Sequence, residues 1–225
     1  AFDETLWLIL QGGWGYRDYP DFELDPSRNE HIWRAAAGGG LLTVGTAAVK
    51  LTLAGAGLAL FQEGLHFLHL RKPGWREDEL EKYVKQFPVA WMDKTSIHGH
   101  QKLAMKVGAR GVHFSASTSE ESIGSWPGKK SKSVHSTDEI TGLKTRFDYF
   151  FLSPVFDSIS KSGYKSHFNL SVLEKWLKMP RSFEVFALGG IDESKIEKVG
   201  SMGFDGVALL GAVWQHREKA ISWRW

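Results

Sequence analysis

Short β-type runs alternate with helix-type segments from about residue 41 to residue 210, and this alternation constrains the fold more than any other feature. The expected strands are Leu41–Gly45, Leu65–Leu70, Lys94–His98, Gly111–Ser115, Ser131–His135, Asp148–Leu152, Glu184–Leu188 and Gly206–Leu210. Between them, apolar residues recur at helical spacing in Glu77–Gln86, Ser171–Lys178 and Asp192–Met202. Strands that alternate with helices pair in parallel through right-handed crossovers, so the pattern predicts an α/β fold.

Eight such strands in a chain of 225 residues favour a closed (β/α)8 barrel, the TIM barrel. An open, doubly wound sheet is the alternative architecture. The glycine-rich GxGxxG turn that often follows the first strand of such sheets is missing after Leu41–Gly45, which disfavours the alternative.

The first forty residues do not follow the alternation. They are rich in Trp, Tyr, Asp, Pro and Gly, so we assign residues 1–40 to an atypical N-terminal extension, a candidate for partial disorder, and residues 41–225 to the barrel. Leu6–Leu10 is an alternative first barrel strand. The apolar stretch Ala35–Phe61 carries only Lys50 as a charge, yet its many Gly, Ala and Thr residues favour a buried strand and helix over a membrane segment.

Composition excludes several classes of function. The net charge is +2, from 28 basic and 26 acidic residues, which gives no electrostatic footprint for nucleic acid. The chain has no cysteine, so disulfides, zinc–thiolate sites and thiol nucleophiles are excluded, and a cytoplasmic location is expected. Small-molecule substrates are the expected partners.

Glycines follow the last two expected strands, where a barrel places its active site. Gly189 and Gly190 end one strand just before a helix at Asp192, and Gly211 ends the other. Backbone amides at helix N-termini can bind phosphate, although the same glycines could serve only to make tight turns. After the preceding strand, Ser158, Ser160 and Lys161 form a polar loop that suits the same anion.

Histidines follow three other strands. His135 ends the fifth strand, where an imidazole can move protons near neutral pH. His69 and Arg71 alternate around Leu70, so both are expected to face the barrel interior, where Arg71 could bind a phosphate or carboxylate. His98 and His100 follow the third strand and could bind phosphate or a metal, but no third ligand is visible, so no metal ligands are assigned.

Several segments between Phe61 and Gln215 together resemble the thiamine phosphate synthase and TenI family, in family order. The segments are LHLRKPG, LAMKVGARGVHF, SVHSTDE, DYFFLSPVFDSISKSG, FALGGID and GFDGVALLGAV. The resemblance implies a (β/α) barrel with a thiazole phosphate site. It implies that Ser158, Ser160 and Lys161 contact the thiazole and its phosphate, and that backbone of Gly190, Leu210 and Gly211 binds the phosphate. Arg71 would face the pyrimidine diphosphate.

The chain departs from the family at the magnesium site. Family synthases carry an Asn-Asp pair after the third strand, where this chain has His98 and Gly99, and a second aspartate after the fourth strand, where it has Ser117 and Thr118. A family lysine is matched by Pro73, with Lys72 one place early. No cofactor is therefore assigned, and magnesium is expected only for a synthase.

Three functions follow from the resemblance. A synthase would join hydroxymethylpyrimidine diphosphate to thiazole phosphate. A TenI-type tautomerase would use His135 as acid and base. A catalytically silent barrel would only bind thiazole or thiamine phosphates. A phosphosugar isomerase barrel is a fourth reading, disfavoured by the SPVF segment. A homodimer is compatible with each.

Overall fold

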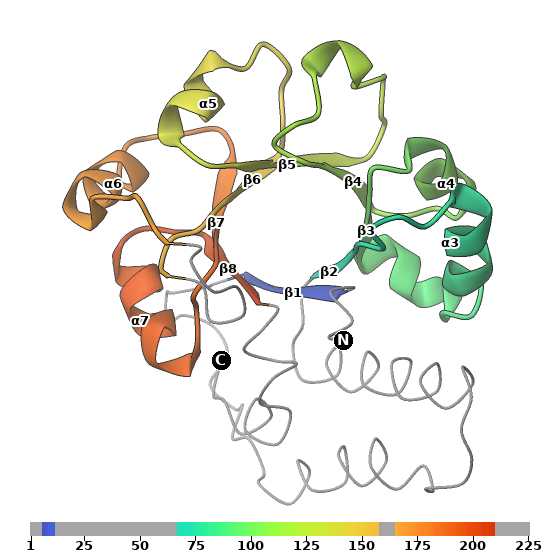
Figure 1. The fold of residues 1–225 in the computed structure, drawn as a ribbon, viewed down its shortest axis with the longest axis horizontal. Coiled ribbons are helices and arrows are strands. Elements are labelled where there is room, and N and C mark those ends of the chain that lie inside the picture. The colour runs from blue at the N-terminus through green and yellow to red at the C-terminus, as the bar shows by residue number, and fades with distance from the viewer. Residues whose placement is uncertain (1–5, 12–66, 158–164, 210–225) are drawn as a thin grey trace, which may run out of the picture.

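A computed structural model describes residues 6–11, 67–157 and 165–209 of the chain. Eight strands form a closed barrel in the order of the sequence, with helices around the outside (Figure 1). The strands are β1 Leu6–Gln11, β2 Phe67–Leu70, β3 Thr95–His98, β4 Gly111–Phe114, β5 Lys129–Val134, β6 Tyr149–Leu152, β7 Glu184–Leu188 and β8 Gly206–Leu209. The α/β fold predicted from the alternation is therefore confirmed.

The described helices follow the strands in the expected order. They are α3 Glu77–Val84, α4 Gln101–Lys106, α5 Thr137–Gly142, α6 Leu170–Leu177 and α7 Glu193–Ser201, with 3₁₀ turns η1 Val89–Lys94 and η2 Glu120–Ser122. The sequence predicted α3, α6 and α7 to within two residues at each end. The two six-residue helices α4 and α5 are too short to show a clear helical period, so neither is predicted from the sequence.

Strands β2 to β8 pair in parallel, each with the next along the chain. Strand β1 differs because it runs antiparallel to both of its neighbours, β2 and β8. The prediction of a regular barrel of eight parallel strands was therefore wrong for one strand. The first barrel position is taken by the alternative strand near Leu6–Leu10, inside the stretch assigned to an extension.

Two predicted features lie outside the described residues. The expected first strand Leu41–Gly45 belongs to the stretch 12–66, as does the apolar segment Ala35–Phe61. Within the described ranges, no helix combines the length and the apolar character needed to cross a bilayer.

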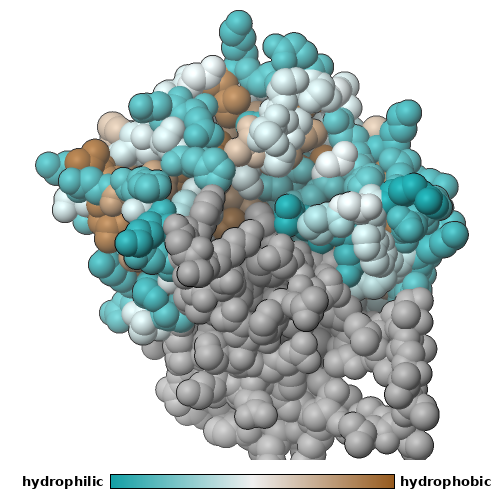
Figure 2. Space-filling model, viewed as in Figure 1, coloured by the Kyte–Doolittle hydropathy of each residue, from teal (hydrophilic) through white to brown (hydrophobic). Residues whose placement is uncertain are grey.

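The strands separate two apolar cores. The outer core lies between strands and helices and includes Leu70, Leu80, Leu103 and Leu177, each at most 1% exposed. The inner core, inside the barrel, consists of Phe67, Tyr149, Phe151, Phe186 and Ala208, with Leu188 packed against it. Burial of a large apolar side chain contributes roughly 1.5–3 kcal/mol, so both layers stabilise the barrel. On the face shown in Figure 2, hydrophilic side chains cover most of the described surface.

Candidate active site

Three histidines from three adjacent strands meet inside the barrel, where His69 and His113 pack against Phe151 of the aromatic inner core. They are His69 on β2, His98 at the end of β3 and His113 on β4. His69 and His113 are buried and His98 is half-buried, and one ring nitrogen from each lies within 4.8 Å of the others. Because Leu70 packs in the outer core, the alternation around His69 follows the predicted register.

Hydrogen bonds hold these rings in place. His69 Nδ1 lies 3.0 Å from His98 Nε2, and His69 Nε2 lies 2.8 Å from the Tyr149 hydroxyl. The Tyr149 hydroxyl is also 3.1 Å from Ser96 Oγ. His113 bonds at both nitrogens to hydroxyls of the next strand, Ser131 and Ser133, each at 2.8 Å. The four strands β2, β3, β4 and β5, together with Tyr149 of β6, thus share one polar network.

Burial controls the charge of the network. It lowers the pKa of His69 and of His98 well below the ordinary value, with further lowering from the neighbouring histidines. Burial, followed by the charges of Lys132 and Arg71, lowers the pKa of His113 to about 3. The three imidazoles are therefore neutral near pH 7, and each keeps a nitrogen lone pair.

Arg71, just after β2, acts on this cluster through its charge, whereas Lys72 and His100 lie against other side chains. The charge of Arg71 lowers the pKa of both His98 and His113. The Lys72 ammonium lies 4.8 Å and 4.9 Å from the ring centres of Trp75 and Tyr83. His100 Nδ1 lies 3.9 Å from a Glu77 carboxylate oxygen, on the side of α3.

His135 lies in the loop after β5, where it contacts the loop after β6. Its Nδ1 donates a hydrogen bond to the Ser153 carbonyl at 2.7 Å, which leaves Nε2 with the lone pair in the neutral ring. The Glu139 carboxylate accepts a hydrogen bond from the His135 backbone amide, while the Glu139 amide donates to Ser136 Oγ. These bonds fix both the backbone and the tautomer of His135.

Gly189 and Gly190 bring the end of β7 against the loop after β6. Both have positive φ, +93° and +67°, a region that favours glycine. A Cβ at Gly190 would lie 2.2 Å from the Asp157 carbonyl oxygen, and one at Gly189 would lie 2.8 Å from Pro154 Cβ. Close packing of two loops therefore requires both glycines, independently of any phosphate.

The remaining predicted site residues fall outside the described part of the chain. They are Ser158, Ser160, Lys161, Leu210 and Gly211. Of the expected phosphate pocket, the structure describes only the β7 loop and the start of α7. Asp192 caps that region, and its carboxylate accepts hydrogen bonds from Ser194 Oγ and Lys195 Nζ.

A sequence profile of the thiamine monophosphate synthase family matches residues 44–213, more than half of the chain. The chain belongs to the thiamine monophosphate synthase family.

Individual members of this family share moderate identity with the chain. A thiamine-phosphate synthase of Listeria monocytogenes is 31% identical over 117 residues, 49% of this chain and 55% of that protein. A thiamine-phosphate synthase of Listeria welshimeri is 30% identical over 60% of this chain and 66% of that protein. The crystal structure of a thiamine phosphate pyrophosphorylase from Bacteroides thetaiotaomicron is 29% identical with a TM-score of 0.61, covering 77% of this chain and 81% of that one. The matched segments thus span about half to two thirds of the first two relatives.

The family resemblance places magnesium between carboxylates after β3 and β4, and the described residues do not fit that ion. His98 and Gly99 follow β3, while Ser117 and Thr118 follow β4 and bond to Ser115 Oγ at 3.0 Å and 2.9 Å. The Glu120 carboxylate accepts hydrogen bonds from the Lys144 and Thr145 amides. Magnesium prefers oxygen ligands, whereas the side chains that converge here are imidazoles.

Sequence reasoning missed three members of this site. His113 and Tyr149 lie within strands rather than after them, so a search of strand ends passes over them. Lys132 Nζ donates to the carbonyls of Ser115 and Thr118, at 2.8 Å and 2.7 Å, and so holds the loop after β4. The usable signal was the pair of small hydroxyl residues at alternate positions of β5, Ser131 and Ser133, which puts both on one face of the strand.

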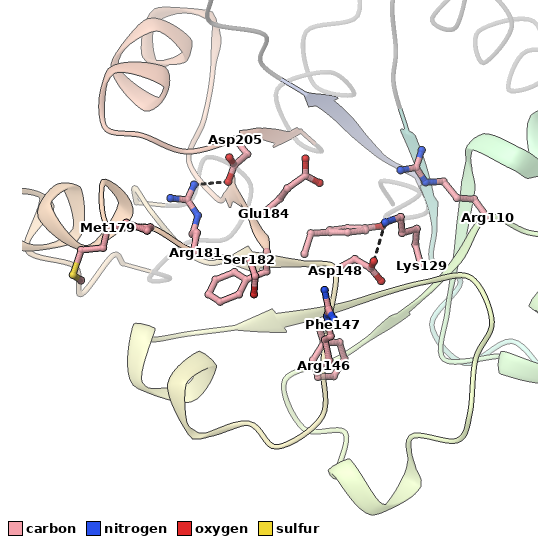
Figure 3. Close-up of a pocket in the computed structure, with 13 residues that line it drawn as sticks. Arg110, Lys129, Arg146, Phe147, Asp148, Met179, Arg181, Ser182, Glu184 and Asp205 are labelled. Atoms are coloured by element: carbon pink, nitrogen blue, oxygen red, sulfur yellow. Dashed lines mark hydrogen bonds and ion pairs between the residues drawn. The ribbon is translucent and has the colours of Figure 1, made fainter.

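A separate cavity of about 730 Å³ lies at the opposite, amino-terminal end of the strands (Figure 3). Its charged groups sit at or just before the first residues of β4 to β8, and several pair with each other. Lys129 Nζ donates to Asp148 at 2.8 Å, and Arg181 pairs with Asp205. In TIM barrels this face serves stability rather than catalysis, so we assign the active site to the histidine end.

Proposed function

We propose that the protein joins a hydroxymethylpyrimidine diphosphate to a thiazole phosphate, the synthase reaction that the family resemblance implies. The match to the family over residues 44–213 is the observation that carries this proposal. In this reaction, the bond between the pyrimidine methylene carbon and the diphosphate oxygen breaks, and diphosphate leaves with the electron pair. The thiazole nitrogen then forms the new bond to the methylene carbon.

Departure of diphosphate requires positive charge or hydrogen-bond donors near the leaving oxygens. Arg71 is our candidate for this role, because it directly follows β2 at the carboxyl end of the barrel and its charge acts on His98 and His113. We assign the thiazole phosphate to the backbone at Gly190 and Gly211, with Ser158, Ser160 and Lys161 from the loop after β6. Leu210 would contribute backbone to the same phosphate.

One observation favours a second function, a TenI-type tautomerase. The hydrogen bond from His135 Nδ1 to the Ser153 carbonyl holds a proton on Nδ1, so the lone pair of the neutral imidazole lies on Nε2. Such a nitrogen can take a proton from one atom of a thiazole and return it to another. The tautomerase reaction needs no diphosphate and no metal.

Products distinguish these functions. The purified chain is incubated with both precursors, with and without Mg²⁺ and with a chelator, and the products are analysed by mass spectrometry. Thiamine phosphate in the mixture is the expected result for the synthase, and its absence under every condition would contradict that function. Isomerisation of the thiazole that survives chelator and is lost in His135→Ala would support the tautomerase. Ligand binding without turnover would identify a silent barrel.

A further inference from the structure

We propose that His69, His98 and His113 bind a divalent transition-metal ion of the zinc type at the carboxyl end of the barrel. Within the described ranges, this is the group of His, Asp or Glu side chains close enough to share one ion. The proposal stands on geometry and does not depend on which reaction the protein catalyses.

The positions of the ligand nitrogens suit one ion. His69 Nδ1 and His98 Nε2 are 3.0 Å apart, and nitrogens of all three rings lie within 4.8 Å. Two nitrogens bound to a tetrahedral zinc ion at about 2.05 Å are roughly 3.3 Å apart. The pair from β2 and β3 is thus already near the required spacing. Binding of one ion would require the nitrogen of the third imidazole, within 4.8 Å of the other two, to move closer to them.

The hydrogen-bond partners of the imidazoles resemble the groups that orient metal-binding histidines. Metal-binding histidines generally bond through their other nitrogen to a fixed polar group, which sets the ring orientation. His69 has such a partner in Tyr149, at 2.8 Å, which Ser96 holds in turn. His113 has two, Ser131 and Ser133, so an ion at either nitrogen displaces one hydroxyl and retains the other.

The chemistry of the group selects the kind of ion. All three donors are imidazoles, which suit Zn²⁺, Co²⁺, Ni²⁺ and Fe²⁺, whereas Mg²⁺ prefers oxygen. Three protein ligands leave a fourth position for water or substrate, and the half-buried His98 lies on the solvent side of the group.

A metal titration of the full chain tests the proposal. After treatment with chelator and dialysis, the protein is titrated with Zn²⁺ and with Co²⁺, whose visible absorption reports nitrogen ligation. We expect one ion per chain, and a Tm that rises with Zn²⁺ concentration. His98→Ala and His113→Gln should each lower the affinity about 100-fold, and Tyr149→Phe about 10- to 100-fold.

Two histidines outside the cluster serve as matched controls. His100→Ala and His167→Ala should leave the affinity and the Co²⁺ spectrum unchanged. Circular dichroism checks that each variant is folded. If a cluster variant does not fold, X-ray absorption of the unsubstituted zinc protein replaces it, with about three imidazoles expected around the ion.

The proposal is wrong if neither ion binds in a one-to-one ratio. It is also wrong if binding persists in both His98→Ala and His113→Gln, or if X-ray absorption shows mainly oxygen ligands. The histidines would then form only a hydrogen-bonded network that fills the barrel. Failure of this test leaves the synthase assay unaffected, since that assay measures product and not bound metal.

Discussion

At the scale of single residues, the barrel interior is divided by chemistry. Aromatic side chains from β2, β6 and β7 fill one part, and histidines with serine hydroxyls fill the other. A buried polar group without a partner costs roughly 1–3 kcal/mol, so each of these histidines needs its hydrogen bonds. The network therefore fixes the orientation of the buried rings of His69 and His113.

Substitution of Gly190 should destabilise the folded protein strongly, even when it adds only a methyl group. In Gly190→Ala, the new Cβ would lie 2.2 Å from the Asp157 carbonyl oxygen, at a φ of +67°. Strain and overpacking of this kind each cost about 1–3 kcal/mol, so we expect a Tm lower by several degrees. Differential scanning calorimetry measures it. Gly142→Ala is the control, because nothing lies within 4 Å of its Cβ, and a Tm drop as large there would contradict this reasoning.

At the scale of elements, the helices depend on caps and on one apolar face. Helix α3 has Glu77, Asp78 and Glu79 in its first turn, near the positive end of the helix dipole, and it buries Leu80, Tyr83 and Val84. Helix α6 begins at an Asn169 cap and buries Leu173 and Leu177. Each helix thus has a chemical start signal and a face that packs on the strands.

The α6 cap offers a test at this scale. Asn169 Oδ1 accepts hydrogen bonds from the backbone amides of Ser171, at 3.1 Å, and Val172, at 3.3 Å. Asn169→Ala removes both and should destabilise the protein by about 1 kcal/mol, measured by urea unfolding. Asn169→Asp keeps an acceptor at the same place and should stay close to the parent. Equal losses in both variants would show that the cap does not stabilise α6.

At the scale of the whole molecule, closure of the barrel and charge at its amino end matter most. Strand β1 completes the ring by pairing with β2 and β8, which leaves neither as an open edge. At the amino ends of the strands, acidic and basic groups gather around one cavity (Figure 3). The stability of the fold should therefore respond to pH through this end.

Glu184, at the start of β7, is the carboxyl group through which we expect the stability of the fold to depend on pH. Burial, and then the Asp205 carboxylate, raises the pKa of Glu184 above its ordinary value of 4.5. The folded state thus holds this proton more tightly than the unfolded state does, so ionised Glu184 reduces stability above its folded pKa. Glu184→Gln should raise the Tm at about pH 8, by about 2–4 °C for each kcal/mol gained, and the gain should vanish as the pH falls to about 4.5.

Thermal melts at several pH values measure this difference. Glu197→Gln, on the exposed side of α7, is the control and should show no such pH dependence. A lower Tm for Glu184→Gln at about pH 8 would mean that attraction to neighbouring cations outweighs the cost of burial.

The sequence by itself determined the elements and their order. Strands β2 to β8 and helices α3, α6 and α7 follow from local periodicity, because alternation and helical spacing depend only on nearby residues. The orientation of His69 followed from the same alternation. The family segments that contain Arg71, His135 and Gly190 could also be recognised from the sequence alone.

Only the tertiary structure decided which distant residues meet. The direction of β1 depends on long-range pairing with β2 and β8, which no local pattern encodes. The sequence showed no third ligand beside His98, but closure of the sheet brings His113 and His69 to it from neighbouring strands. Residues that are far apart in sequence become neighbours through strand register, and register is a property of the whole barrel.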